Sequence, residues 1–396
     1  MVATAADLPF HLDAVADPAT IGAEWRALSQ GGVAVPFQTA DWVTTWVAAG
    51  ALPRGARMLL LRGRLGEATV FVLPLVVERR GPVTLARRLG GGHAGYVLGV
   101  WRADALAALS PATLAAALRD LGRRERIDVF ALDAVPPIWG GVPVPLARLG
   151  TARTSLDDGH LFRLDPSFDA LLAGRNAGHK RKKVRAKEKL LEAAGGYRIA
   201  TAGTEAEIDT ALAAFFAQKG ASLAARGIPD GFADPGIRAA WRGLAVASLG
   251  RDEALLELTT LEAGGAVRAV IGASILGGRL YALFASYAHD DLVRASPGET
   301  LFFRHIEAAC RRGVSVYDMG VGSERYKASW CDDRVELVDV RLPVSLVGRV
   351  WAAAEDLVGR AKTAIRRDER LWPLVRRLRA RLAGREGAGE GEREGQ

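Results

Sequence analysis

The sequence predicts an α+β fold in which mixed sheets are flanked by helices. Short apolar runs of strand length alternate with longer amphipathic segments, and Gly- or Pro-containing turns separate them. The chain has 396 residues, of which 49% are hydrophobic and 25% charged. These values are close to those of an average soluble protein, so they exclude disorder for most of the chain. The length fits about two domains.

The first part of the chain contains both helices and strands. Asp41 opens a helix that carries Trp42 and Trp46 four residues apart on one face. Ser110 is the expected N-cap of a helix that runs to Leu121, because Pro111 follows it in the first turn. The expected strands are Met58–Arg62, Ala68–Val77 and Ile127–Leu132.

Two features of this part point to its internal organisation. Pro74 lies within the second strand and predicts an edge or a bulge, since proline cannot donate to a sheet ladder. A glycine cluster with His93 and Tyr96 follows the strands. Residues 136–155 are rich in proline and glycine and predict a connection between two domains.

The order of helices and strands is clearer in the second part of the chain. Gly195 and Gly196 end a basic helix, and Gly277 and Gly278 separate two strands. We predict a strand, two helices, three antiparallel strands, a loop, a helix and two further strands. Their ranges are Tyr197–Thr201, Glu205–Arg226, Pro235–Leu249, Leu255–Leu261, Val267–Leu276, Arg279–Tyr287, Thr300–Arg312, Val314–Met319 and Arg334–Leu342.

The positive charge is concentrated in two segments. The net charge is +8 and the pI about 9.8. Residues 175–189 hold eight Lys/Arg and one Glu, and residues 360–385 hold ten Lys/Arg and two acids, so the rest of the chain is acidic. The first segment has no aromatic platform, so we do not expect nucleic acid as a partner. Such a run is also typical of a solvated helix face.

The small number of cysteines and the lack of a signal-peptide pattern favour a cytoplasmic protein. Cys310 and Cys331 are the two cysteines and build neither a disulfide framework nor a four-thiolate zinc site. No His/Cys/Asp/Glu spacing indicates a metal, so we expect none. The N-terminus lacks a signal-peptide pattern, and no apolar run reaches the ~18 residues of a membrane span.

Three motifs in the second part resemble one known family. They are Ala295–Leu301 (ASPGETL) before a helix, Tyr317–Gly320 (YDMG) after a strand, and Glu324–Trp330 (ERYKASW). Together with the order of elements over roughly 160–342, they resemble the GNAT acyltransferase superfamily, in its CelD/BcsL-like branch. That branch is related to the Fem-type transferases, which add amino acids to peptidoglycan precursors.

The resemblance implies two GNAT-like domains in tandem, each with a central mixed sheet. It divides the chain into an N-terminal GNAT-like half (1–155) and a C-terminal acyltransferase domain (156–342). Basic amphipathic helices (343–384) and a disordered tail (385–396) follow. Since no clear internal repeat is visible in the sequence, the tandem is an expectation from the family alone.

The turn before the helix at 300 is the expected donor site. A helix N-terminus carries unpaired N–H groups that attract phosphate, and Ser296, Gly298 and Thr300 are small enough for a close approach. The resemblance implies that the pyrophosphate of acetyl-CoA or another acyl-CoA binds here, with Glu299 in the same turn and Arg294 as a charged contact. The alternative is an ordinary helix start with Thr300 as N-cap.

Three residues are candidates for acid–base chemistry, which the transfer needs. The resemblance places the acyl group between two splayed strands. Tyr287 ends the first of these strands and Asp318 lies at the end of the second. We predict Asp318 as base or as a carboxylate that orients the acceptor, and Tyr326 as acid. The alternatives are a loop cap for Asp318 and a core position for Tyr326.

Lys327, Trp330 and His93 are candidates for binding the acceptor. Lys327 and Trp330 follow directly after the predicted acid, and His93 lies in the glycine cluster. For Trp330 a core position is the alternative. For His93 we also keep open a position outside the cleft.

The predicted function is transfer of an acyl group, in the first place acetyl, from acyl-CoA to an amine or hydroxyl. The family's associations imply a sugar or sugar nucleotide of exopolysaccharide or cellulose synthesis as acceptor. One alternative is a Fem-like transferase that uses aminoacyl-tRNA. Another is a non-catalytic module that docks at a membrane synthase. The Arg-rich stripe of residues 371–382 also fits peripheral contact with a membrane.

Overall fold

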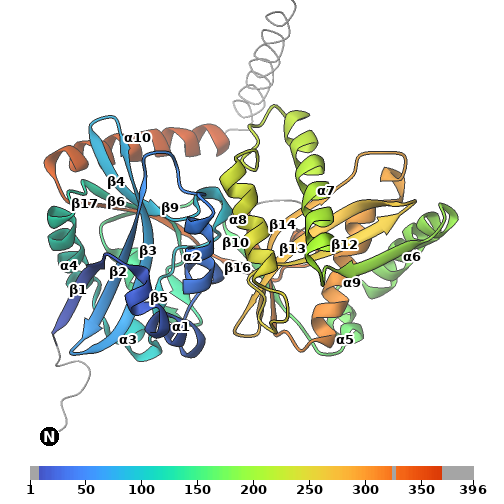
Figure 1. Ribbon diagram of the computed structural model, residues 1–396, viewed down its shortest axis with the longest axis horizontal. Helices are drawn as coiled ribbons and strands as arrows, with labels where there is room; N and C mark the ends of the chain where they lie inside the picture. Colours follow the sequence, from blue (N-terminus) through green and yellow to red (C-terminus); the bar gives the residue numbers. More distant parts are fainter. Residues whose placement is uncertain (1–8, 323–326, 368–396) are drawn as a thin grey trace, which may run out of the picture.

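The computed structural model describes residues 9–322 and 327–367 and contains two mixed β-sheets that helices flank (Figure 1). The predicted fold class is confirmed. The blue and cyan N-terminal elements form one lobe in Figure 1, and the green to orange elements form the other. The long helix α10 (Leu346–Arg367) returns to the first lobe.

The first sheet has the strand order β1-β2-β3-β4-β6-β17-β9, with β5 paired to β3. Its strands are β1 (Phe10–Val15), β2 (Arg57–Leu65), β3 (Ala68–Arg80), β4 (Val83–Arg88), β5 (Val100–Trp101), β6 (Val129–Val135), β9 (Thr151–Thr154) and β17 (Val338–Pro343). All pairs are antiparallel except β4 with β6. The N-terminal helices are α1 (Gly22–Gly31), α2 (Ala40–Ala48), α3 (Ala103–Ala108) and α4 (Pro111–Arg124).

The second sheet has the order β11-β12-β13-β14-β15-β10-β16. Its strands are β10 (Gly159–Arg163), β11 (Tyr197–Thr201), β12 (Glu257–Ala263), β13 (Ala266–Leu276), β14 (Arg279–Tyr287), β15 (Val316–Val321) and β16 (Asp333–Val335). Its helices are α5 (Phe168–Ala173), α6 (Ala177–Ala193), α7 (Glu205–Ala224), α8 (Pro235–Val246) and α9 (Pro297–Arg311). A small hairpin of β7 (Ile138–Trp139) and β8 (Val142–Pro143) lies between the lobes in sequence.

Both sheets follow the same plan. Each has four antiparallel strands, then a helical crossover, then a fifth strand parallel to the fourth. Two further strands complete each sheet next to the fifth strand. The repeat is therefore structural, and a tandem arrangement is visible although the sequence shows no clear internal repeat.

Two chain segments join the sheets as one antiparallel ribbon. Residues 151–163 pair with residues 333–343, first as β9 with β17 in the first sheet and then as β10 with β16 in the second. We predicted one strand over Arg334–Leu342. It is instead two strands in different sheets, because the chain crosses between the lobes around Leu337, whose carbonyl accepts from the Ser155 amide.

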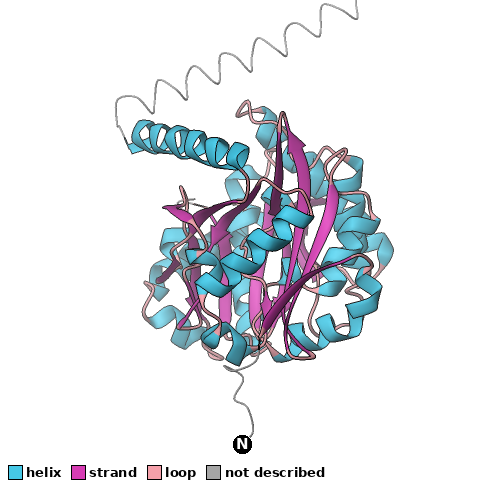
Figure 2. Cartoon of the chain, turned by 90° about the vertical axis from the view of Figure 1, so that its left-hand side faces the viewer, coloured by secondary structure: helices cyan, strands magenta, loops and turns pink. Residues whose placement is uncertain are grey.

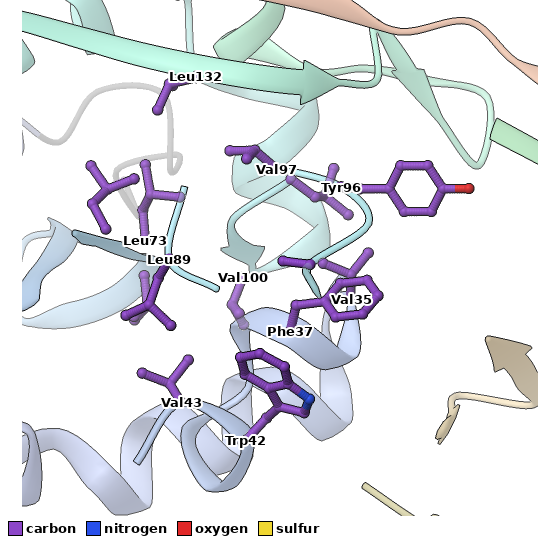
Figure 3. Packing of buried hydrophobic residues seen from close by; sticks show 14 of the residues in the cluster. Val35, Phe37, Trp42, Val43, Leu73, Leu89, Tyr96, Val97, Val100 and Leu132 are labelled. Carbon is purple, nitrogen blue, oxygen red and sulfur yellow. The ribbon is translucent and has the colours of Figure 1, made fainter. Parts of the chain in front are cut away.

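Aromatic packing holds the lobes together. Trp42 and Trp46 stack with ring centroids 4.6 Å apart, which confirms that they share one face of α2. Trp241 of α8, in the other lobe, packs edge-on against both rings. Figure 3 shows Trp42 and Phe37 at one side of the first core, with Leu73, Leu89 and Val97 above them. The Ser110 hydroxyl accepts from the Thr113 amide, as predicted for an N-cap.

Only some of the predictions for the C-terminal segment fall on residues that the structure describes. Helix α10 is confirmed up to Arg367, whereas the basic stripe of 371–382 and the tail of 385–396 lie outside the described residues. Within 9–322 and 327–367, no helix combines the length and apolar character needed to span a bilayer.

Candidate active site in the second sheet

The parallel strands β14 and β15 diverge after a short stretch of pairing. Their ladder joins Arg279–Tyr281 to Val316–Asp318 and ends there. Strand β14 continues to Tyr287, paired on its other side with β13. In the described part of the chain, its edge from Ala282 to Tyr287 therefore has no strand partner toward β15. We call this gap between β14 and β15 the wedge.

Helix α9 begins at the open end of the wedge. Ser296, with φ +46°, is its N-cap, so the alternative of Thr300 as N-cap is wrong. The amides of Glu299 and Thr300 both donate to the Ser296 carbonyl, at 3.1 and 3.2 Å. Within the described residues this leaves the Gly298 N–H as the unpaired backbone donor of the turn. The Thr300 hydroxyl is buried and has no hydrogen-bond partner there either.

Basic helix α6 supplies positive charge to this turn. Lys183 lies 2.8 Å from the Glu299 carboxylate, and Lys187 is paired with the same group. Burial favours the neutral acid, but hydrogen bonds from both lysines hold the pKa of Glu299 below its usual value. One stripe of the basic run thus faces the wedge, and it is more than a solvated face. Arg294 is exposed in the short helix just before α9.

Another lysine of α6 contacts the segment that follows β15. Lys180 donates to the Ser329 carbonyl at 2.9 Å, and its Nζ lies 4.2 Å from the centre of the Trp330 ring. Burial of this ammonium lowers the pKa of Lys180. Since Lys180, Lys183 and Lys187 are three and four residues apart, they share one helix face.

Asp318 lies at the closed end of the wedge and is fully buried. One carboxylate oxygen accepts from the Tyr96 hydroxyl (2.9 Å) and the Gly320 amide (2.7 Å). The other accepts from Arg279 (2.6 Å), whose guanidinium stacks over the Trp139 ring. Burial disfavours the charged guanidinium, but the Asp318 charge raises the pKa of Arg279 overall. To act as a base, Asp318 would have to give up these contacts.

Arg279 and Tyr96 hold the Asp318 carboxylate and were not predicted. Tyr96 comes from the first lobe, 222 residues before Asp318. Its hydroxyl is buried next to a carboxylate, and both effects raise the pKa of Tyr96. The signal for Arg279 was a charge at the start of an otherwise apolar strand, directly after a Gly-Gly turn.

Lys327 supports the end of β15. Its Nζ is 3.3 Å from the Gly320 carbonyl and 3.2 Å from the Val321 carbonyl, and the residue is only 3% exposed. The ammonium thus ties the segment at Lys327 to the end of β15. Trp330 packs among Phe162 and Phe303 in the core. Its core position, the alternative we considered, is the observed one.

The remaining candidates lie in three different places. Tyr287 is at the rim of the wedge, 46% exposed, and its ring is 4.6 Å from that of His289. His93 donates from Nε2 to the Gly231 carbonyl (3.1 Å) and packs on Trp46 and Phe232, so it belongs to the contact between lobes. Burial lowers the pKa of His93. Tyr326, the predicted acid, lies outside the described residues.

The equivalent gap in the first sheet is filled by the chain itself. Strands β4 and β6 pair only over Leu85–Arg87 and Val129–Ala131. Beyond this point Val97 donates its amide to the Ala134 carbonyl of β6 (3.0 Å), and residues 96–98 are buried. In Figure 3 the Val97 side chain points into the first core while the Tyr96 ring points away from it. An extended ligand therefore has no room in this sheet.

A cavity of about 440 Å³ lies elsewhere, between β11 and the C-terminal part of α9. Its lining includes His305, which is bonded to the Tyr317 hydroxyl at 2.8 Å, and Arg312, which is paired with Glu257. Burial, together with the charge of Arg312, lowers the pKa of His305 to about 4. The other two arginines of the lining, Arg304 and Arg311, are paired with Glu188 and Glu307 outside it. In residues 9–322 and 327–367 we find no cluster of His, Cys, Asp and Glu that could hold a metal.

Comparisons with known proteins agree with this geometry. Residues 178–328 match the family of the acetyltransferase (GNAT) domain. FemX has 12% identity and a TM-score of 0.56, over 83% of this chain and 96% of that one. A putative lysylphosphatidylglycerol synthetase domain from Agrobacterium fabrum has 11% identity and a TM-score of 0.53, over 86% and 97%.

A third solved structure, a protein of unknown function from Bacteroides thetaiotaomicron, has 15% identity and a TM-score of 0.50, over 84% of this chain and 98% of that one. No curated protein matches the sequence significantly. At these identities the structures show the fold alone. The chain shares the fold of these structures, and residues 178–328, in its second lobe, are similar to the acetyltransferase (GNAT) domain.

Proposed function

We propose that the protein transfers an acyl group, in the first place acetyl, from acyl-CoA to an amine or hydroxyl. One observation carries the proposal: β14 and β15 pair over three residues and then diverge beside the first turn of α9. The unpaired edge of β14 offers backbone groups to an extended thioester arm. The turn of α9 and the lysines of α6 offer positive charge to phosphates at the end of that arm.

The chemistry breaks the C–S bond of the thioester and forms a C–N or C–O bond. One proton passes from the acceptor to the departing thiolate. We propose Tyr326 as the acid for the departing thiolate, with Tyr287 at the rim of the wedge. For Asp318 we propose that it positions Arg279 and Tyr96 at the closed end of the wedge, because both of its oxygens are already bonded.

The donor's phosphates have identifiable partners in this proposal. Gly298 contributes its amide, Arg294 an exposed guanidinium, and Lys183 and Lys187 their ammonium groups. Glu299 competes with phosphate for the two lysines. A carboxylate that already binds there indicates the charge and position that an anionic ligand would take.

The acceptor that we propose is a sugar or sugar nucleotide in exopolysaccharide or cellulose synthesis. Its support is the resemblance of the motifs to the CelD/BcsL-like branch. We expect the acceptor to reach the wedge from the side away from the first turn of α9, where the donor phosphates are proposed to lie.

The proposal is tested by titrating the full-length protein with CoA and acetyl-CoA in a calorimeter. Replacing Lys183 and Lys187 by Ala removes two charge-assisted contacts, which should weaken binding about 10- to 100-fold. The matched control replaces Lys182 and Lys189, exposed on the same helix, and should leave binding nearly unchanged. Glu299→Gln should preserve or tighten it, because the lysines lose a competitor.

Turnover is measured with radiolabelled acetyl-CoA and a panel of amino sugars. Label transfer to one of them establishes the acceptor class. Absence of CoA binding by the wild-type protein would refute the proposed donor. Binding of CoA that is insensitive to the change at Lys183 and Lys187 would refute the proposed site.

A Fem-like reaction with aminoacyl-tRNA is the second candidate. The fold it shares with FemX over 83% of the chain favours it, as do the exposed side chains of Lys182, Arg185 and Lys189 on α6. Salt-dependent binding of tRNA without binding of CoA would replace the first proposal by this one. Binding of neither would favour a non-catalytic module at a membrane synthase.

A further inference from the structure

Helix α10 presents an apolar stripe to solvent although its other face is firmly packed. Five of the eleven large apolar side chains that are exposed in the described residues lie on this one helix. They are Leu346 (76%), Val347 (47%), Val350 (72%), Leu357 (71%) and Val358 (47%). At about 100° per residue they fall within an arc of about 120°. Apolar side chains gathered on one outward face give α10 the amphipathic pattern of helices that bind at a surface.

The packed face shows that the orientation of α10 is fixed. Trp351 lies against the cluster of Val83 and Leu85 on the first sheet. Gly348 approaches the Asp128 carbonyl so closely that any Cβ there would clash. Ser345 caps the helix by accepting from the Gly348 amide at 3.0 Å. The apolar stripe is thus held outward and cannot turn toward the core.

Charges around the stripe favour an anionic partner. Arg349 and Arg360 are exposed along one side of it. Of the acids of α10, Glu355 lies on another face and is paired with Arg341, whereas Asp356 lies on the side of the two arginines and is paired with Arg360. The sequence from 360 to 385 adds ten Lys/Arg against two acids. A helix with an outward apolar face that a strongly basic segment follows in the sequence is typical of binding to the interface of an anionic bilayer.

The position of α10 in the molecule leaves room for such a surface. It lies along the outer margin of the first lobe in Figure 1 and stands at the edge of the body in Figure 2. The small area of the stripe also argues against a second copy of the chain as its partner. Residues 346–360 are about 20 Å long, and a stripe about 10 Å wide covers only ~200 Å², against ~800 Å² per partner in a stable protein interface.

We propose that α10 lays its outward stripe into the surface of an anionic phospholipid bilayer. The inference is independent of the wedge and of the proposed reaction. The aliphatic side chains enter the boundary between headgroups and acyl chains, while the arginines beside them contact lipid phosphates. Docking of this kind would hold the enzyme at a membrane without any spanning helix.

The test is flotation of the full-length protein with vesicles of phosphatidylcholine, alone or mixed with phosphatidylglycerol. We expect binding to the mixed vesicles and at least tenfold weaker binding to the neutral ones. Leu357→Asp should lower the partition coefficient about tenfold or more, because it removes a large apolar contact. Ile228→Asp is the matched control on the second lobe, where a side chain 46% exposed lies outside the stripe, and should leave the coefficient unchanged.

Three outcomes would overturn the proposal. The wild-type protein could fail to float with mixed vesicles, or Leu357→Asp could float as well as wild type. Light scattering could instead show a wild-type dimer that Leu357→Asp converts to a monomer, which would assign the stripe to a second copy. Because Leu357 is 71% exposed, the variant should fold, and circular dichroism checks this.

Discussion

Replacing Asp318 by Asn distinguishes a structural carboxylate from a catalytic base. Asn keeps the shape of the side chain but removes its charge. Arg279 would then be a largely buried cation without a counter-ion, since its side chain is only 17% exposed. Removing one partner of a buried ion pair costs about 3–5 kcal/mol. The Tyr96 hydroxyl would also face a weaker acceptor.

The assay is urea denaturation of the full-length protein, with turnover or donor binding measured on the same samples. We expect Asp318→Asn to lower the free energy of unfolding by about 3–5 kcal/mol. Tyr96→Phe should cost less, about 1–3 kcal/mol, because the same oxygen keeps its bond to the Gly320 amide. Asp332→Asn is the matched control, since that carboxylate is 63% exposed beside Arg175 and an exposed pair contributes only ~0–1 kcal/mol.

A base at position 318 would give the opposite pattern. Turnover would fall by orders of magnitude while stability changed by less than about 1 kcal/mol. That result would refute our reasoning that Asp318 serves mainly to join Tyr96 and Arg279 across the lobes.

Three further predictions concern other parts of the fold. His305 is held neutral with a pKa of about 4, so its contribution to stability is complete above pH ~6.5 and falls by up to ~3 kcal/mol as the pH drops toward 4. His305→Asn should flatten that part of the stability profile in thermal unfolding at stepped pH. Lys327→Met should cost ~1–3 kcal/mol and weaken donor binding, with recovery in Lys327→Arg, because two carbonyls lose their donor. Gly348→Ala should cost ~1–3 kcal/mol in urea denaturation, whereas Gly31→Ala, with open space around it, should cost nothing.

Local patterns were sufficient for two strands of the second sheet. The strands Tyr197–Thr201 and Arg279–Tyr287 were predicted with their observed bounds. Gly-Gly turns stand directly before both strands. Strand β14 also pairs with β13, its neighbour in sequence, so little long-range information was needed for it. The helix α9 begins three residues earlier than predicted, because Pro297 fits the first turn of a helix and Ser296 accepts a left-handed conformation.

Long-range pairing explains what the sequence did not reveal. Pro74 suggested an edge strand or a bulge, yet β3 lies inside the first sheet. Pro74 is tolerated because β5 pairs with Phe71 and Val72 and β4 begins to pair at Leu75, so no partner on that side needs its missing N–H. The partner of Asp318 was equally hidden, since a contact with Tyr96 spans 222 residues.

The gap between β4 and β6 in the first sheet differs from the wedge in the second sheet. In the first sheet the segment around Val97 fills the gap between β4 and β6, which removes room for a donor there. The preceding residue of the same segment, Tyr96, reaches Asp318 at the closed end of the wedge in the second sheet. One short stretch of chain thus closes one potential site and supports the other. We therefore expect one donor molecule per chain, although the fold is duplicated. The first lobe acts as a fixed support that preserves the shape of the wedge in the second sheet.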